Sequence, residues 1–347
     1  MTCTTRAGDI IGPVPLVAFT RGADVESTHL GTVAVVDADG RTIASAGDPD
    51  RPTFMRSSAK PFQAMAFIET GAAEALGVTP AELAVIAASH SGEPRHIEAI
   101  HGLLARAGLT DAVLQNGVHA PLHAPTRSAL ERSGEAPSPV HHNCSGKHCG
   151  MVCACVHQGW DLRTYIRPDH PLQRRIRTLV ADVTGVPANA IGIGIDGCGV
   201  PTFRLPLCSF AYAFAGLAEP ERLPTKHRQA AELVRTAMAA NPGMVAGEGR
   251  FDTRLIEATG GRVLSKGGAE ACQGVALLDR GLGIAVKIED GGARAVAVAV
   301  LEILRQLGAI DHAETERLRD LAQPPIKNYR DEIVGEARPL FALRRDR

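Results

Sequence analysis

Hydrophobic and polar residues follow a strand-like pattern at both ends of this chain. Residues 14–22 and 28–48 are rich in Val, Ala and Ile, and the turn Ala-Asp-Gly at 38–40 interrupts the second run. Residues 262–292 hold three further short apolar runs around glycine turns, with Asp-Arg-Gly at 279–281 as a hairpin signal. Short apolar runs bounded by such turns are typical of β-strands. We therefore predict strands near both termini.

The middle of the chain has helical periodicity instead. Apolar positions in residues 57–77 recur at the spacing of one helix face, and Ser57 or Ser58 would cap the helix that they form. Residues 78–245 are predicted to be mostly helical, with the amphipathic stretch 223–243 as the clearest case. A long apolar helix follows the last strands, over residues 293–310.

These patterns predict an α/β fold of two lobes. If the strands from both ends share one antiparallel sheet, the middle of the chain is a helical lobe inserted into a sheet lobe. We place the sheet lobe at residues 1–75 and 246–347 and the mainly helical lobe at residues 76–245.

Composition and charge exclude several classes of protein. The net charge is −1 and the Lys and Arg residues are scattered, so no basic surface for nucleic acid is expected. No stretch approaches the roughly 18 uninterrupted apolar residues of a membrane span, and the N-terminus does not resemble a secretory signal. The eight cysteines are clustered, which suits a reducing compartment. We expect a cytoplasmic homodimer with neither nucleic acid nor membrane as a partner.

The first candidate for chemistry is the Ser-x-x-Lys pair of Ser57 and Lys60 at the start of a helix. On the first helical turn the two side chains project to one face, so the amine can reach the hydroxyl. A serine becomes a good nucleophile when a neighbouring base takes its proton, and lysine is such a base when its pKa is depressed. The alternative is a serine that caps the helix beside a solvated lysine.

Two further stretches carry similar groups. Lys266 lies on a predicted strand and is followed by two glycines, which would let a substrate approach the sheet edge. A second amine near the first would lower the pKa of both. Ser89 and His90 follow an apolar run and can supply a second hydroxyl or a proton relay. A surface lysine and a helix cap are the alternatives.

Residues 143–155 contain four of the eight cysteines. Their spacing fits neither a zinc finger nor a Cys-x-x-Cys redox motif, and residues 150–157 are predicted to be a buried helix in which cysteine is a small apolar residue. Cys144 precedes this helix, where free backbone N–H groups favour the thiolate that binds metals. Cys198 lies beside Asp196 in a glycine-rich turn and is a possible distant partner.

Taken together, these stretches resemble the Rhizobium-type (thermolabile, inducible) L-asparaginases. The matching segments are RGADVESTHLG, MRSSAKPFQA, ASHSGEP, HNCSGKHCGM, IGIDGCGVPTF, SKGGAE and KIEDGGARA, and the resemblance runs from about residue 15 to the C-terminal GEARP. It implies a fold similar to serine β-lactamases and glutaminases. It also implies hydrolysis of the side-chain amide of L-asparagine to L-aspartate and ammonia.

The same resemblance assigns residues to roles. The catalytic set would be Ser57, Lys60, Ser89 and Lys266. Zinc would be the cofactor, bound by Cys144, Lys147 and Cys198. From charge matching alone, we expect Arg56 and Asp196 to hold the α-carboxylate and the α-ammonium group of the substrate, and we place His90 with them.

Other functions fit the same residues. A glutaminase or a broader amidase differs from an asparaginase by about one methylene of substrate, which is worth roughly 1–3 kcal/mol of discrimination. A penicillin-type acyl-enzyme is disfavoured by the absence of an export signal. A non-catalytic zinc-binding relative would keep the fold without releasing ammonia.

Overall fold

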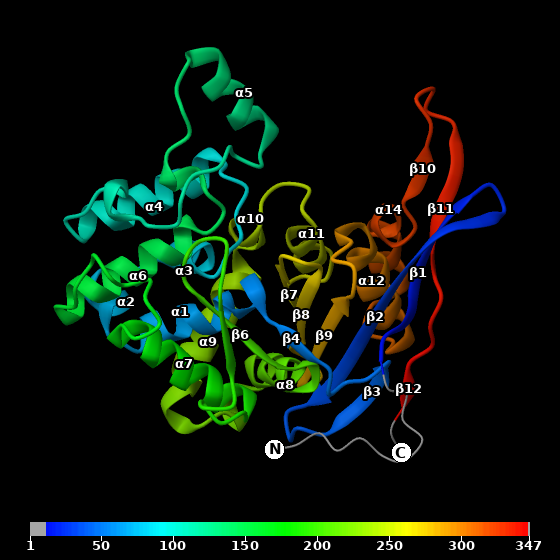
Figure 1. The fold of residues 1–347 in the computed structure, drawn as a ribbon, viewed down its shortest axis with the longest axis horizontal. Helices are drawn as coiled ribbons and strands as arrows, with labels where there is room; N and C mark the ends of the chain where they lie inside the picture. Colours follow the sequence, from blue (N-terminus) through cyan, green and yellow to red (C-terminus); the bar gives the residue numbers. More distant parts are fainter. Residues whose placement is uncertain (1–11, 346–347) are drawn as a thin grey trace. The chain divides into compact units, whose positions relative to one another are not determined.

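A computed structural model describes residues 12–345 of the chain (Figure 1). The chain forms two compact units. One unit, here called the sheet unit, contains the residues up to Ser58, Leu205–Glu219 and the residues from Ala258 onward. The other, the helical unit, contains Ala59–Arg204 and Pro220–Glu257. The prediction that concerns a secretory signal falls largely on residues 1–11, which lie outside the described residues.

The sheet unit is built on an antiparallel sheet whose strands come from both ends of the chain, as predicted. The strand order is β10-β11-β1-β2-β9-β8-β7, and β3 pairs with β2 and with β12. The strands are β1 (Val14–Arg21), β2 (Asp24–Asp37), β3 (Thr42–Ala46), β7 (Val263–Gly268), β8 (Cys272–Leu277), β9 (Leu282–Ile288), β10 (Pro325–Lys327), β11 (Ile333–Pro339) and β12 (Arg344–Arg345). A short strand, β4 (Pro52–Phe54), precedes the 3-10 helix Arg56–Ala59. The predicted α/β class with an antiparallel sheet is therefore confirmed.

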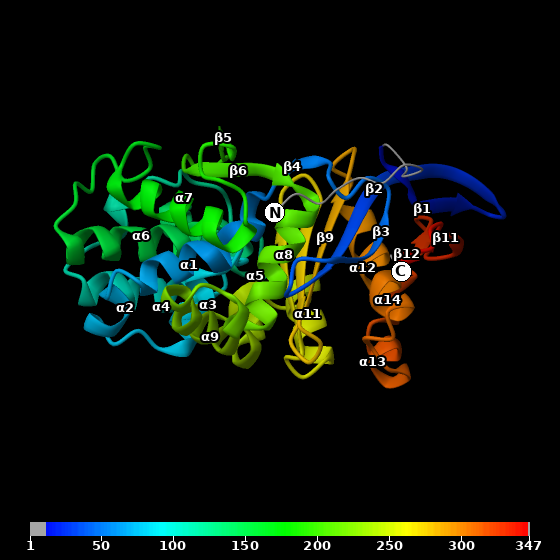
Figure 2. The ribbon, with the colours of Figure 1, turned by 90° about the horizontal axis from the view of Figure 1, so that it is seen from below.

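Helices cover both faces of this sheet. The strands β8 and β9 are buried on both faces of the sheet. Consecutive side chains along each strand point to opposite faces, and almost all of them are inaccessible. The apolar helix α8 (Leu207–Ala218) packs against β2, β8 and β9, whereas α12 (Val296–Gln306) packs against β1, β9 and β11. Figure 2 shows α8 and α12 on opposite sides of the strands. The short helices α13 (His312–Arg317) and α14 (Arg319–Ala322) follow α12.

The helical unit is centred on α1 (Lys60–Ile68), whose residues from Lys60 to Phe67 are all buried. The helices α6, α7 and α9 pack around it. The other elements are α2 (Ala72–Ala75), α3 (Pro80–Ile86), α4 (Pro94–Arg106), α5 (Ala124–Ser133), α6 (Ser145–Gln158), α7 (Pro171–Thr184), α9 (Thr225–Ala240), α10 (Pro242–Val245) and α11 (Phe251–Ala258). The strands β5 (Gly192–Ile195) and β6 (Pro201–Pro206) form a hairpin.

The start of α1 differs from the sequence prediction. Neither Ser57 nor Ser58 caps the helix, because both belong to a 3-10 turn and α1 begins at Lys60 without a side-chain cap. The hydroxyl of Ser58 donates instead to the carbonyl oxygen of Lys266, at 2.8 Å. Pro61 occupies the first turn, where its missing N–H costs nothing.

The units divide the chain at different places from the predicted lobes. The chain passes from the sheet unit to the helical unit between Ser58 and Ala59, whereas the sequence placed the change near residue 75. The apolar helix α1 belongs with the helices that pack around it, and α8 belongs with the sheet that it covers. Among residues 12–345, no helix is both long and apolar enough to cross a bilayer.

Candidate functional site

Lys60 is the most constrained candidate residue in the helical unit. It is the first residue of α1 and its side chain is fully buried. Its amine nitrogen lies 2.6 Å from the carbonyl oxygen of Ala88, 3.2 Å from that of Asn143 and 2.9 Å from the hydroxyl oxygen of Ser89. The structure thus brings Lys60 and Ser89, which are 29 residues apart, into direct contact.

This arrangement orients the Lys60 amine toward one hydroxyl. Carbonyl oxygens only accept hydrogen bonds, so the Lys60 amine donates to both of them. The amine also donates to the Ser89 hydroxyl, so Lys60 joins this hydroxyl to the two carbonyls. Burial lowers the pKa of Lys60. The structure therefore places a buried amine with a lowered pKa in contact with a serine hydroxyl.

His90, the next residue, is committed to the protein on both ring nitrogens. Its Nδ1 accepts from the backbone N–H of Gly92 at 3.1 Å, and its Nε2 lies 2.8 Å from the Ser145 hydroxyl. That hydroxyl donates to the carbonyl of Val140 at 2.7 Å, so Nε2 carries the proton and donates. Burial keeps the pKa of His90 well below its ordinary value. His90 thus links the segment of Ser89 to the start of α6.

Cys144, Lys147 and Cys198 also come together in the helical unit, although Cys198 is distant in sequence. Cys144 occupies the N-cap position of α6, and Lys147 lies in the first turn. The amine of Lys147 lies 3.1 Å from the sulfur of Cys198. Close packing places α6 here, because a Cβ at Gly146 would collide with the carbonyl group of Val85 on α3.

The thiols of Cys144 and Cys198 are hydrogen-bonded to each other. The hydrogen bond from Cys198 holds the pKa of Cys144 well below its ordinary value, and the same bond raises the pKa of Cys198. Burial alone would lower the pKa of Lys147, but the charges of Cys198 and Cys144 outweigh burial and raise it. These pKa directions favour an ammonium group on Lys147 beside a thiolate on Cys144.

The donors of this cluster fit a thiophilic divalent cation. Buried thiolate sulfurs suit zinc and not magnesium or calcium, whereas the amine of Lys147 can bind a metal only after it loses a proton. Within residues 12–345, no group of three or more His, Cys, Asp and Glu side chains is placed to hold a metal ion. A metal at this site would therefore need the lysine as its third protein ligand.

Asp196 lies in the turn that presents Cys198. The turn is closed by backbone hydrogen bonds from Asp196 N–H to Val200 at 2.9 Å and from Gly199 N–H to Asp196 at 2.8 Å. The Asp196 carboxylate is half-buried and contributes to the raised pKa of Lys147. The carboxylate therefore lies within electrostatic range of the cysteine–lysine cluster.

The remaining predicted residues belong to the sheet unit. Arg56 and Ser57 lie in the 3-10 turn before α1, and Arg56 has a left-handed backbone (φ 49°), which is unusual for a residue with a side chain. Lys266 on β7 is fully buried, and its amine donates to the carbonyl of Gly267 at 2.6 Å. That Arg56, Ser57 and Lys266 form one active site with Lys60 and Ser89 stays a prediction.

Sequence reasoning missed several groups around the predicted residues. The carbonyls of Ala88 and Asn143, which orient Lys60, have no sequence signature because every residue has a carbonyl. His148 was also missed. Its Nδ1 lies 2.7 Å from the hydroxyl of the buried Tyr165, and its buried Nε2 has no hydrogen-bond partner among residues 12–345. Its position directly after Lys147 in the sequence could have indicated that it lies near the cysteine–lysine cluster.

Similar solved structures include two β-lactamases. One, from Sphaerobacter thermophilus, is 14% identical over 82% of this chain and 93% of its own, with a TM-score of 0.42. The other, from Mycobacterium bovis, is 14% identical over 84% of this chain and 95% of its own, with a TM-score of 0.41. Both similarities are remote, and neither bears on the reaction.

Comparison with curated proteins finds no match for this chain. A family model gives the clearest result. The model describes L-asparaginase II, and it matches residues 17–339, a span that contains every predicted site residue. The chain therefore belongs to the L-asparaginase II family, whose description indicates a hydrolase that acts on amides.

Proposed function

We propose that this protein is an L-asparaginase that hydrolyses the side-chain amide of L-asparagine to L-aspartate and ammonia through a covalent serine intermediate. Family membership supports the reaction class. The contact of 2.9 Å between the buried Lys60 amine and the Ser89 hydroxyl supports the serine–lysine chemistry. It is the observation on which the mechanism mainly depends.

In the proposed reaction, Ser57 is the nucleophile. Its oxygen attacks the amide carbon while Lys60, three residues later, takes the hydroxyl proton. The C–N bond of the tetrahedral intermediate then breaks, and the proton passes from Lys60 through Ser89 to the departing nitrogen, which leaves as ammonia. A β-aspartyl ester remains on Ser57, and water cleaves it to release aspartate and the free serine.

Lys266 and the substrate-binding residues complete the proposal. The buried amine of Lys266 would oppose protonation of Lys60, because two neighbouring ammonium groups repel each other. Arg56 would bind the α-carboxylate and Asp196 the α-ammonium group. Since both nitrogens of His90 are bonded to the protein, we propose that His90 acts by holding the Ser89 segment and not by touching the substrate.

Cys144, Lys147 and Cys198 would hold the zinc ion. Bound zinc would supply a fixed positive charge that orients the substrate or the surrounding residues. Lysine binds a metal as the neutral amine, so the site must release the Lys147 proton on loading. The thiol–thiolate pair already present supplies the second sulfur after loss of one further proton.

Ammonia release by the purified protein tests this function. Asparagine and glutamine are assayed in parallel by coupled ammonia detection, with a chelator-treated sample beside them. Preferred release from asparagine supports the proposal. Preferred release from glutamine identifies a glutaminase, and release from neither amide identifies a non-catalytic relative. The predicted homodimer is checked on the same sample by light scattering.

A further inference from the structure

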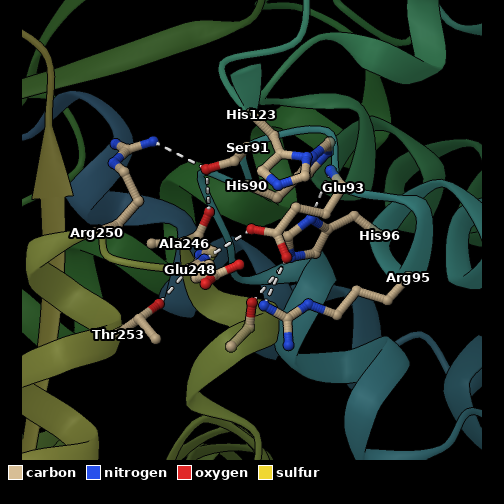
Figure 3. Close-up of polar contacts among 12 residues, drawn as sticks. His90, Ser91, Glu93, Arg95, His96, His123, Ala246, Glu248, Arg250 and Thr253 are labelled. Carbon is tan, nitrogen blue, oxygen red and sulfur yellow. Dashed lines mark hydrogen bonds and ion pairs between the residues drawn. The ribbon is translucent and has the colours of Figure 1, made fainter. Parts of the chain in front are cut away.

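The segment that carries Ser89 has no regular secondary structure of its own. Residues 88–93 lie between the end of α3 and the start of α4 and belong to neither. Their conformation is therefore imposed by neighbouring segments of the helical unit. One neighbour is the stretch 243–248, which we call the strap (Figure 3).

Hydrogen bonds join the strap to the Ser89 segment at two positions. The backbone N–H of Ser89 itself donates to the carbonyl of Val245 at 3.0 Å. Two residues later, the hydroxyl of Ser91 donates to the carbonyl of Ala246 at 2.8 Å and accepts from Arg250 at 3.3 Å. The strap therefore fixes both the backbone and a side chain of this segment.

Glu93 adds the strongest of these contacts. The residue is 5% exposed, and its Oε1 accepts from the backbone N–H of Glu248 at 2.7 Å. Its other oxygen pairs with Arg95 at 2.6 Å. A carboxylate that accepts a backbone N–H at this distance is roughly twice as strong an acceptor as a neutral group. Figure 3 shows the Glu93 carboxylate between Arg95 and the strap.

The ends of the strap are held as well. His96 accepts from the backbone N–H of Glu93 at 3.1 Å, and its Nε2 donates to the carbonyl of Gly243 at 2.9 Å. Thr253 accepts from the N–H of Gly247 at 3.0 Å and donates to the carbonyl of Pro242 at 2.9 Å. These bonds leave the strap little freedom to follow a displaced Ser89 segment.

Gly247 shows how closely the strap approaches Glu93. It has a φ of 128°, a conformation that other residues rarely adopt. A Cβ there would collide with Oε1 of Glu93 and lie 2.6 Å from the hydroxyl oxygen of Ser91. Only glycine at position 247 allows the contact, so the close packing of Glu93 against the strap depends on Gly247.

We propose that Glu93 is a positioning residue for Ser89. Its carboxylate locks the strap, and the strap holds the backbone of Ser89 so that the hydroxyl meets the Lys60 amine. This proposal rests on the proposed function, in which Lys60 and Ser89 transfer a proton. The contact between Glu93 and the strap would keep these two residues aligned. Displacement of catalytic groups by about 1 Å can cost roughly 10²-fold in rate.

Glu82 provides a matched control within the same unit. It is also a buried carboxylate in a capping box, is 7% exposed and pairs with Arg106 at 2.7 Å. Its hydrogen bonds go to Thr79 and Arg106, and not to the strap. The variants are Glu93→Ala, Glu93→Gln and Glu82→Ala, each assayed for kcat, KM and melting temperature.

The expected result is a split between kcat and KM. Glu93→Ala should lower kcat roughly 10- to 100-fold with little change in KM. Glu93→Gln should recover most of kcat, because its amide oxygen can still accept from Glu248. Glu82→Ala should lower the melting temperature and leave kcat within about twofold of wild type. A Glu93→Ala enzyme with wild-type kcat, or equal losses in both alanine variants, overturns the proposal.

A second measurement separates this proposal from the proposed function. Hydrogen exchange of the Ser89 backbone amide reports the bond to Val245 whether or not the protein releases ammonia. Glu93→Ala should speed that exchange roughly tenfold or more, as expected for loss of a charged hydrogen bond, whereas Glu82→Ala should not. If wild type is inactive, the proposed function fails and unchanged exchange in Glu93→Ala still overturns the role of Glu93.

Discussion

The amine of Lys60 lies 2.9 Å from the hydroxyl oxygen of Ser89, and two backbone carbonyls hold it in that direction. Both residues belong to the helical unit, so their contact does not depend on how the two units are arranged. The strongest chemical prediction from the structure concerns this pair.

Replacing Lys60 by Met should abolish most ammonia release. The change removes the base and leaves two buried carbonyls without their donor, so kcat should fall by roughly 10²–10⁴-fold, the range for a general base. Lys327→Met is the control, because that lysine is half-exposed and makes only a loose ion pair of 3.7 Å. Turnover of Lys60→Met within tenfold of wild type, by coupled ammonia assay, would contradict the assignment.

Ser57→Ala and Ser89→Ala should differ in kind. Loss of the nucleophile removes the covalent intermediate, so the Ser57 variant should show no acyl-enzyme by intact-protein mass spectrometry after rapid quenching. Loss of the relay slows the reaction, but the Ser89 variant should still form the ester. If the acyl-enzyme persists in Ser57→Ala and is absent from Ser89→Ala, Ser89 is the nucleophile and Ser57 is not.

Cys198→Ser should lose zinc. Serine cannot supply the thiolate, and Lys147 would remain charged beside a neutral hydroxyl. Zinc content of protein purified from zinc-supplemented medium is measured by mass spectrometry, with Cys155→Ala as the control for a buried thiol at the far end of α6. Equal zinc in Cys198→Ser and wild type would show that the metal binds elsewhere or not at all.

His227 should make stability depend on pH. Its Nδ1 lies 2.6 Å from Glu69 and its Nε2 lies 3.0 Å from Asp182, so one buried ring joins α9 to α7 and to the end of α1. Burial alone would lower the pKa of His227, but the bonds to Glu69 and Asp182 outweigh it and raise the pKa above 6.5.

The sign of the effect follows from the raised pKa. The stabilisation is fully present below the unfolded pKa, near 6.5, and is lost as pH rises through the folded value. His227→Gln should therefore lose roughly 1–3 kcal/mol of unfolding free energy at about pH 5.5 and less at about pH 8.5. Urea titrations at both pH values measure the difference, and an equal loss at both would show that the imidazolium charge is unimportant.

The sequence predicted the elements well where one physical pattern dominated. The strands β1–β3 and β7–β9, the helix α9 and the buried cysteine helix α6 were all predicted from apolar periodicity and turn residues, whereas the strands β10–β12 were not predicted. The approach of Cys198 to Lys147 was suggested by residue type and family resemblance, although 51 residues separate them.

Other features were not predictable from residue patterns. The start of α1 was misplaced because the Ser58 hydroxyl bonds to the backbone of Lys266, a partner more than 200 residues away. The two carbonyls on Lys60 and the contact of Glu93 with Glu248 use backbone atoms, which every residue has. Such contacts depend on tertiary structure, and no local pattern indicates them.

The pairing of β1 with β11 has a consequence for how the protein is made. Val17 lies opposite Pro339, so β1 leaves the ribosome long before its partner β11. Until then, one edge of β1 is unpaired, and an exposed strand edge can join to other chains. Contacts between residues so far apart also form slowly. Synthesis, and not the folded state, is therefore the stage at which this protein should need a chaperone most.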